Sequence, residues 1–121
     1  MNETANFGST NVTVTGVRRN PAGAPEGKTY LIVRVKVENA SDREITVGSL
    51  DFKAQTGQGA IIECFLIPFV EAQKPPFATL APGGWVEGEI VFETDAGDQD
   101  VKLIYQPGWL FGSERIYFNL R

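Results

Sequence analysis

The residues best suited to chemistry are acidic side chains that follow residues 85–93, a segment in which apolar and polar residues alternate. Asp95, Asp98 and Asp100 lie in a loop that also contains Gly97. Calcium takes six to eight oxygen ligands at about 2.3 to 2.6 Å, and carboxylates supply them well, but this loop lacks the length and the bidentate glutamate of an EF-hand. Two interpretations stay open: a calcium site on these three aspartates, or a solvated loop in which they accept turn hydrogen bonds.

A second acidic set, Glu87, Glu89 and Glu93, alternates along one extended segment. Two carboxylates can act as the acid and base of a glycosidase, but one of them then needs a raised pKa in a cleft. Carboxylates exposed on a flat sheet lack that environment. We expect them instead to face Arg34 and Lys36 on a neighbouring strand, where each pair contributes about 0.2 to 1 kcal/mol and helps to fix the register.

The chain has no histidine and one cysteine, Cys64. Histidine-based general bases, Ser-His-Asp and Cys-His pairs, and zinc sites that contain histidine are therefore excluded. A single cysteine forms no internal disulfide, and its apolar neighbours in the sequence favour an inert buried thiol. With no cofactor fingerprint in the sequence either, we predict that the protein is not an enzyme and holds no cofactor.

Aromatic residues and prolines gather in three segments, 64–70, 75–77 and 107–112, largely outside the alternating pattern. Loops are ordinarily polar, so such segments either fold over an open end of the core or form an exposed patch for a partner. In the second case, aromatic anchors beside prolines lose little entropy on binding. The candidate binding residues are Phe65, Phe69, Phe77, Trp109, Leu110 and Phe111.

The composition predicts one soluble globular domain. The 11 basic and 15 acidic residues give a net charge of −4, which argues against nucleic-acid binding because phosphates need a basic field. No apolar stretch approaches the roughly 20 residues of a membrane-spanning helix. We expect residues 1–9 to form a flexible segment and residues 10–121 a single domain, since 121 residues suffice for one core.

Alternation with a period of two dominates the chain and predicts an all-β protein. In residues 28–39, Leu31 and every second residue to Val37 are apolar, and residues 85–93 repeat the pattern. These two strands are expected to be partners. The expected strands are 11–17, 28–39, 50–55, 60–66, 85–93, 101–106 and 114–120. Seven short strands separated by turn signals favour an antiparallel sandwich of two sheets.

Two runs of the sequence carry a family resemblance: GKTYLIVRVKVEN followed by SDREITV and DFK, and LAPGGWVEGEIVFE closed by VKLIY. Together they resemble a bacterial family of unknown function with an immunoglobulin-like sandwich, found mostly in secreted proteins and cell-surface lipoproteins and akin to a mycobacterial secreted immunogenic antigen. The resemblance covers roughly residues 27–105 and implies an immunoglobulin-like fold. It brings no catalytic residues.

The function expected from all of this is a non-enzymatic interaction module of the cell envelope, binding an unknown protein partner through the loop aromatics. Two alternatives stay open: a module that associates with itself through the same patch, and a calcium-dependent adhesion or sensor domain. The N-terminus shows no export signal. An extracytoplasmic protein would therefore need a signal or membrane tether outside this sequence, and a cytoplasmic location is the alternative.

Overall fold

The computed structural model describes residues 3–6, 10–20, 24–48, 51–64, 76–106 and 116–120, of which 3–6 and 116 are described for their backbone alone. The strands are β1 (Glu3–Asn6), β2 (Thr10–Asn20), β3 (Lys28–Asn39), β4 (Ile45–Val47), β5 (Phe52–Gln55), β6 (Ile61–Glu63), β7 (Ala78–Leu80), β8 (Trp85–Asp95), β9 (Lys102–Tyr105) and β10 (Ile116–Asn119). In these parts of the chain, no helix is long and apolar enough to cross a membrane.

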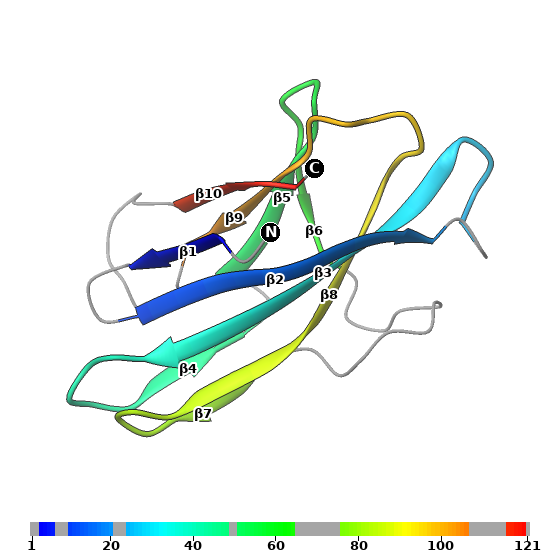
Figure 1. Ribbon diagram of the computed structural model, residues 1–121. Coiled ribbons are helices and arrows are strands. Elements are labelled where there is room, and N and C mark those ends of the chain that lie inside the picture. The colour runs from blue at the N-terminus through cyan, green and yellow to red at the C-terminus, as the bar shows by residue number, and fades with distance from the viewer. Residues whose placement is uncertain are drawn as a thin grey trace.

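The strands form two four-stranded sheets and one short pair (Figure 1). The first sheet has the order β1-β2-β3-β8, the second has the order β10-β9-β5-β6, and β4 pairs with β7. Every pairing is antiparallel. The all-β sandwich and its seven expected strands are confirmed. Strands β1, β4 and β7 were not expected, and β1 lies within the segment predicted to be flexible.

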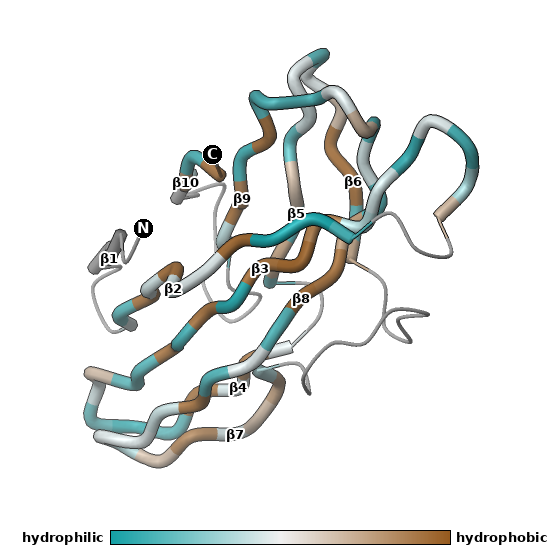
Figure 2. The backbone as a smooth tube through the Cα atoms, turned by 45° about the vertical axis from the view of Figure 1, so that its right-hand side comes forward, coloured by the Kyte–Doolittle hydropathy of each residue, from teal (hydrophilic) through white to brown (hydrophobic). Residues whose placement is uncertain are grey.

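Strands β3 and β8 are the long strands of the first sheet. Lys28 to Glu38 pair with Asp95 to Trp85, the partnership that the alternation predicted. In Figure 2, apolar and polar residues alternate along the halves of both strands nearest β4 and β7, and an apolar run occupies the middle of each strand. The inward side chains of β3 are Leu31, Val33, Val35 and Val37, all fully buried. One core cluster joins them to side chains of the second sheet, among them Phe52, Leu103 and Phe118.

Strand β2 keeps its apolar side chains on the core side because it contains a β-bulge. The register breaks between Val14 and Gly16, which makes Thr15 the extra residue. One extra residue shifts the alternation by one position. Val17 therefore packs against the core, and Arg18 points outward.

The outer face of the first sheet is closed by ion pairs. The guanidinium of Arg18 donates hydrogen bonds to both carboxylate oxygens of Glu89, whose side chain is only 3% exposed. Arg34 pairs with Glu87, with Nε and Oε2 3.2 Å apart. The expected pairing between β3 cations and β8 carboxylates is thus confirmed for Arg34. The expectation that Glu89 is exposed is wrong, because Arg18, turned outward by the bulge, covers it.

A small apolar cluster lies on the same outer face. Its buried members are Tyr30, Ile32 and Val91. Lys36 also has a partner there, since its Nζ lies 4.8 Å from the ring centroid of Trp85 in a cation–π contact. Lys36 therefore contacts an aromatic ring in addition to facing the predicted carboxylate of Glu87 across the strands.

One buried side chain, Asn39, holds the turn after β3. Its Nδ2 donates to the carbonyl oxygens of Arg43 at 2.8 Å and Leu80 at 3.0 Å, and its Oδ1 accepts from the N–H of Ser41 at 2.9 Å. Side-chain bonds of this kind satisfy backbone groups where a strand ends. The bond to Leu80 also fastens β7, and with it the β4–β7 pair, to the end of β3.

Candidate functional site: the outer face of the second sheet and its pocket

The outer face of the second sheet consists of two rows of side chains in register. Ala54, Leu103 and Phe118 belong to the core cluster, so their neighbours along β5, β9 and β10 point outward. The first row consists of Ile61, Gln55, Lys102 and Asn119. The second row consists of Glu63, Lys53, Ile104 and Tyr117, of which Ile104 is fully buried. Tyr117 is 47% exposed and Ile61 is 44% exposed, so this face carries large apolar surface at both of its edge strands.

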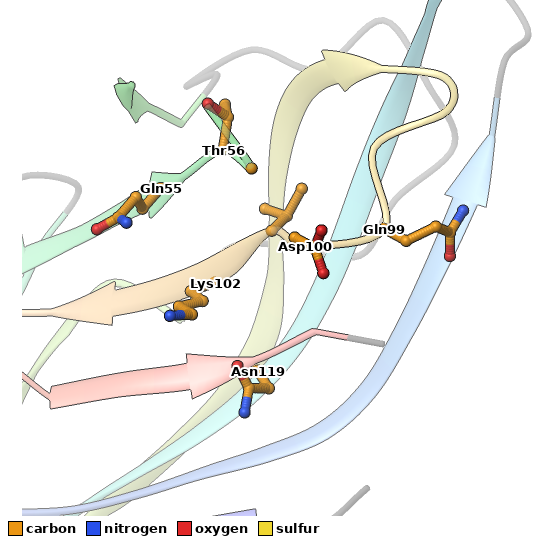
Figure 3. Close-up of a pocket in the computed structure, with 8 residues that line it drawn as sticks. Gln55, Thr56, Gln99, Asp100, Lys102 and Asn119 are labelled. Carbon is orange, nitrogen blue, oxygen red and sulfur yellow. The ribbon is translucent and has the colours of Figure 1, made fainter. Parts of the chain in front are cut away.

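A polar pocket of about 380 Å³ opens at the end of this face (Figure 3). Its lining consists of Gln55, Thr56, Gly57, Gln99, Asp100, Val101, Lys102 and Asn119. In Figure 3, Gln55, Lys102 and Asn119 come from three adjacent strands, with Asp100 on the segment that leads into β9. The pocket therefore combines side chains of the first row with two turns, one at residues 56–57 and one at residues 99–101.

The pocket gathers hydrogen-bonding side chains, and four of them are not used by the protein in its described residues. It holds one ammonium, one carboxylate, one hydroxyl and three side-chain amides. Within the described residues, the side chains of Gln55, Gln99, Lys102 and Asn119 make no hydrogen bond and no ion pair. Their donors and acceptors are consequently free to bind solvent or a ligand.

Asp98 fixes the two turns that form the pocket wall. Its carboxylate accepts hydrogen bonds from the backbone N–H of Gly57 at 2.8 Å and of Asp100 at 2.9 Å. These two bonds lower the pKa of Asp98 below its ordinary value, because they stabilise the charged form. A Cβ on residue 57 would lie 2.7 Å from Asp98 Oδ1, so the close approach requires glycine. The wall is therefore built before any ligand binds.

The three aspartates predicted as a calcium site have different roles. Asp95 forms an ion pair with Lys28, Asp98 accepts the two backbone bonds, and Asp100 lines the pocket. Across the part of the chain that the structure describes, no three acidic or cysteine side chains converge on a point that could hold a metal ion. Calcium binding stays a prediction that this geometry does not support.

Of the loop residues predicted to bind a partner, one is described. Phe77 is partly buried and packs against the core cluster, which agrees with the alternative that this loop covers the core. Phe65, Phe69, Trp109, Leu110 and Phe111 lie outside the described residues. Cys64 also packs against the core, and burial raises the pKa of its thiol, as expected for an inert cysteine.

A comparison with protein families assigns most of the chain. The model of the family called "Domain of unknown function (DUF4352)" matches residues 1–116. A search of curated proteins found no match.

Solved structures with a similar fold come from two bacterial genera, Bacillus and Clostridium. The yjhA protein of Bacillus subtilis is 20% identical, with a TM-score of 0.76, and the match covers 98% of this chain and 97% of that one. The ycdA protein of the same species, described as a candidate lipoprotein, is 21% identical with a TM-score of 0.72. That match covers 95% of this chain, which spans 37% of the length of ycdA. An uncharacterised β-sandwich protein of Clostridium difficile is 10% identical, with a TM-score of 0.59 and coverage of 100% and 91%.

Proposed function

The chain belongs to the DUF4352 family of domains of unknown function, and from that premise we propose that it is a non-enzymatic binding module that acts outside the cytoplasm. The observation that carries the proposal is the outer face of the second sheet. There, exposed Tyr117 and Ile61 flank a row of polar side chains without partners in the described structure. Large exposed apolar groups rimmed by polar ones are typical of binding surfaces.

The chemistry of the pocket supports binding rather than catalysis. The chain has no histidine, and a base or nucleophile needs a partner that activates it. Lys102 has no such partner among the described residues. Donors and acceptors of this kind orient a ligand and need no chemical step.

Two observations outside the site support the cellular location. One similar structure is a candidate lipoprotein of Bacillus subtilis, and a lipoprotein is held at a membrane from outside the fold. The chain spans about a third of that protein, so a tether or further domains are compatible with this fold. The kinship with a mycobacterial secreted antigen stays a prediction.

The loop aromatics remain part of the proposal. Residues 107–115 connect β9 to β10, whose outward residues build the site, and they include Trp109, Leu110 and Phe111. A ligand larger than the pocket would extend from the first row to the exposed ring of Tyr117 on β10, the strand that this connection leads into. We therefore expect Trp109 to contribute to affinity together with Tyr117.

The test uses fluorescently labelled protein and purified cell walls and membranes of Bacillus subtilis, the source of two similar structures. We expect wild-type protein to sediment with one of these fractions, and the double variant Tyr117→Ser with Ile61→Ser to lose most of that binding. Trp85→Ser is the matched control, since Trp85 is 58% exposed on the other sheet. Equal binding by all three proteins would overturn the assignment of the face.

Light scattering on the same samples tests the alternative of self-association. A wild-type dimer that Tyr117→Ser splits into folded monomers would assign this face to a second copy of the chain. If the protein is a monomer at every concentration, self-association is excluded and the face is assigned to an external ligand.

A further inference from the structure

We propose that the polar pocket at the end of the second sheet binds a neutral sugar residue. The inference rests on the proposed binding function and deepens it by naming the chemical class of the ligand. Nothing in the family description or in the names of the similar structures assigns a ligand to this pocket.

The charges around the pocket favour a ligand without net charge. Lys102 and Asp100 contribute one charge of each sign to the lining. Asp98 adds a second negative charge directly behind the wall, where it bonds to Gly57. An anionic ligand would meet the two aspartates, and a cationic ligand would meet Lys102, so either charge is opposed from one side. A neutral ligand avoids both costs.

The remaining groups suit hydroxyl recognition. Each of the side-chain amides of Gln55, Gln99 and Asn119 presents an N–H donor and a carbonyl acceptor in one plane, and a sugar hydroxyl both donates and accepts. Adjacent strands lie about 4.8 Å apart, so the row from Gln55 to Asn119 spans about 10 Å. That span and a volume of about 380 Å³ accommodate one sugar ring and part of the next.

Tyr117 supplies the apolar contact that a sugar needs. It lies two residues before Asn119 on β10, on the same outward face, and is 47% exposed. The C–H face of a sugar ring can cover the flat face of an aromatic ring and remove apolar area of both from water. A chain of two or more sugars bound in the pocket would reach this ring.

The experiment is a titration followed by nuclear magnetic resonance on the full chain labelled with nitrogen-15. The probes are glucose, N-acetylglucosamine and their β-1,4-linked dimers at millimolar concentration. Glucuronic acid tests whether the pocket binds an anionic ligand, and glycylglycine tests whether it binds a zwitterionic one. We expect at least one neutral sugar to shift the side-chain amide signals of Gln55 and Asn119, and its dimer also to shift the signals of Tyr117.

Variants test whether the pocket is the site. Gln55→Ala and Asn119→Ala each remove one amide and should weaken sugar binding roughly tenfold, the loss of one or two hydrogen bonds. Gln58→Ala is the matched control, because it removes an exposed amide from the same turn without touching the pocket lining. The spectrum of each variant shows directly that it is folded.

Three results would overturn the proposal: no shift with any neutral sugar, shifts that the Gln58 variant loses as much as the Asn119 variant, or stronger binding of glycylglycine or glucuronic acid. The last result would assign the pocket to a charged ligand. Each of these outcomes leaves the cell-wall test of the proposed function intact. If the cell-wall test failed while a neutral sugar still shifted the pocket signals, the pocket would bind sugar but the proposed role at the cell envelope would be wrong.

Discussion

The outer faces of the two sheets use charged side chains in opposite ways. On the first sheet, Arg18 covers a buried carboxylate, Arg34 pairs with Glu87, and Lys36 lies over an aromatic ring. On the second sheet, Lys53 pairs with Glu63 at 3.8 Å, and Lys102 has no partner within the described residues. The first face satisfies its own polar groups, whereas the second leaves them available.

This difference separates stability from binding. A buried charge whose partner is removed costs several kcal/mol, because the remaining charge is neither solvated nor paired. An exposed side chain without a partner costs almost nothing to replace. Substitutions on the first face should therefore change the free energy of unfolding, and substitutions on the second face should change ligand affinity.

The largest effect is expected from Arg18→Met, which keeps the apolar stem and removes the charge. Glu89 would then stay buried without its guanidinium partner. We expect the free energy of unfolding in urea to fall by about 3 kcal/mol. If Lys102→Met caused an equal loss, the two faces would not differ in the way described.

A smaller effect is expected from Asp98→Ala, which removes the link between the pocket's two turns. The loss of two backbone hydrogen bonds at a partly exposed carboxylate should cost about 1 kcal/mol at pH 7. The pKa of Asp98 is lower in the folded state than in the unfolded state. Its contribution is therefore complete above the unfolded value of about 3.9 and is lost as the pH falls through the folded value.

Urea titrations of wild type and Asp98→Ala between pH 7 and pH 2 measure this contribution. The two stabilities should converge as the pH falls below about 4. A constant difference over that range would mean that Asp98 acts by packing and not by accepting hydrogen bonds as a carboxylate.

The smallest effect on stability is expected at Lys102. Lys102→Met should change the free energy of unfolding by less than about 0.5 kcal/mol, because the ammonium is exposed and has no partner in the described residues. The same variant should weaken the binding of any ligand that uses the pocket. Circular dichroism melts measure the first quantity, and the sugar titration measures the second. A strong destabilisation would show that the second face also stabilises itself through its charges.

Millimolar calcium should leave the melting temperature unchanged, since Asp98 already accepts two backbone bonds and Asp95 has Lys28 as its partner. A ligand that binds the folded state alone raises the melting temperature. A rise with calcium that Asp100→Asn abolishes would restore the calcium hypothesis and would make the acidic loop, not the pocket, the centre of function.

The main sheets could be predicted because their signals are local. Alternation in residues 28–39 and 85–93 defines which side of each strand is apolar, and two long amphipathic strands bury those sides most completely when they pair. The three-residue strands β4 and β7 carry too little alternation to be recognised. The bulge at Thr15 was missed because its only trace is the spacing from Val14 to Val17 beside Gly16.

The pocket could not be predicted for a different reason. Gln55, Lys102 and Asn119 are far apart in the sequence and form one row only because β9 lies between β5 and β10. Asp100 alone among the pocket residues carried a chemical signal in the sequence. Exposed glutamine and asparagine are ordinary surface residues until strand order brings them together.

Because of the bulge in β2, the alternate positions whose side chains face the core change partway along this strand. Up to Val14 one set of alternate positions faces the core, and from Val17 onward the other set does. Deleting Thr15 would place Val14 directly before Gly16, so that one regular alternation would run through β2, with Val17 still facing the core and Arg18 still facing outward. A substitution at position 15 keeps the extra residue and the bulge, whereas this deletion would remove the bulge and leave each remaining side chain of β2 on its present face.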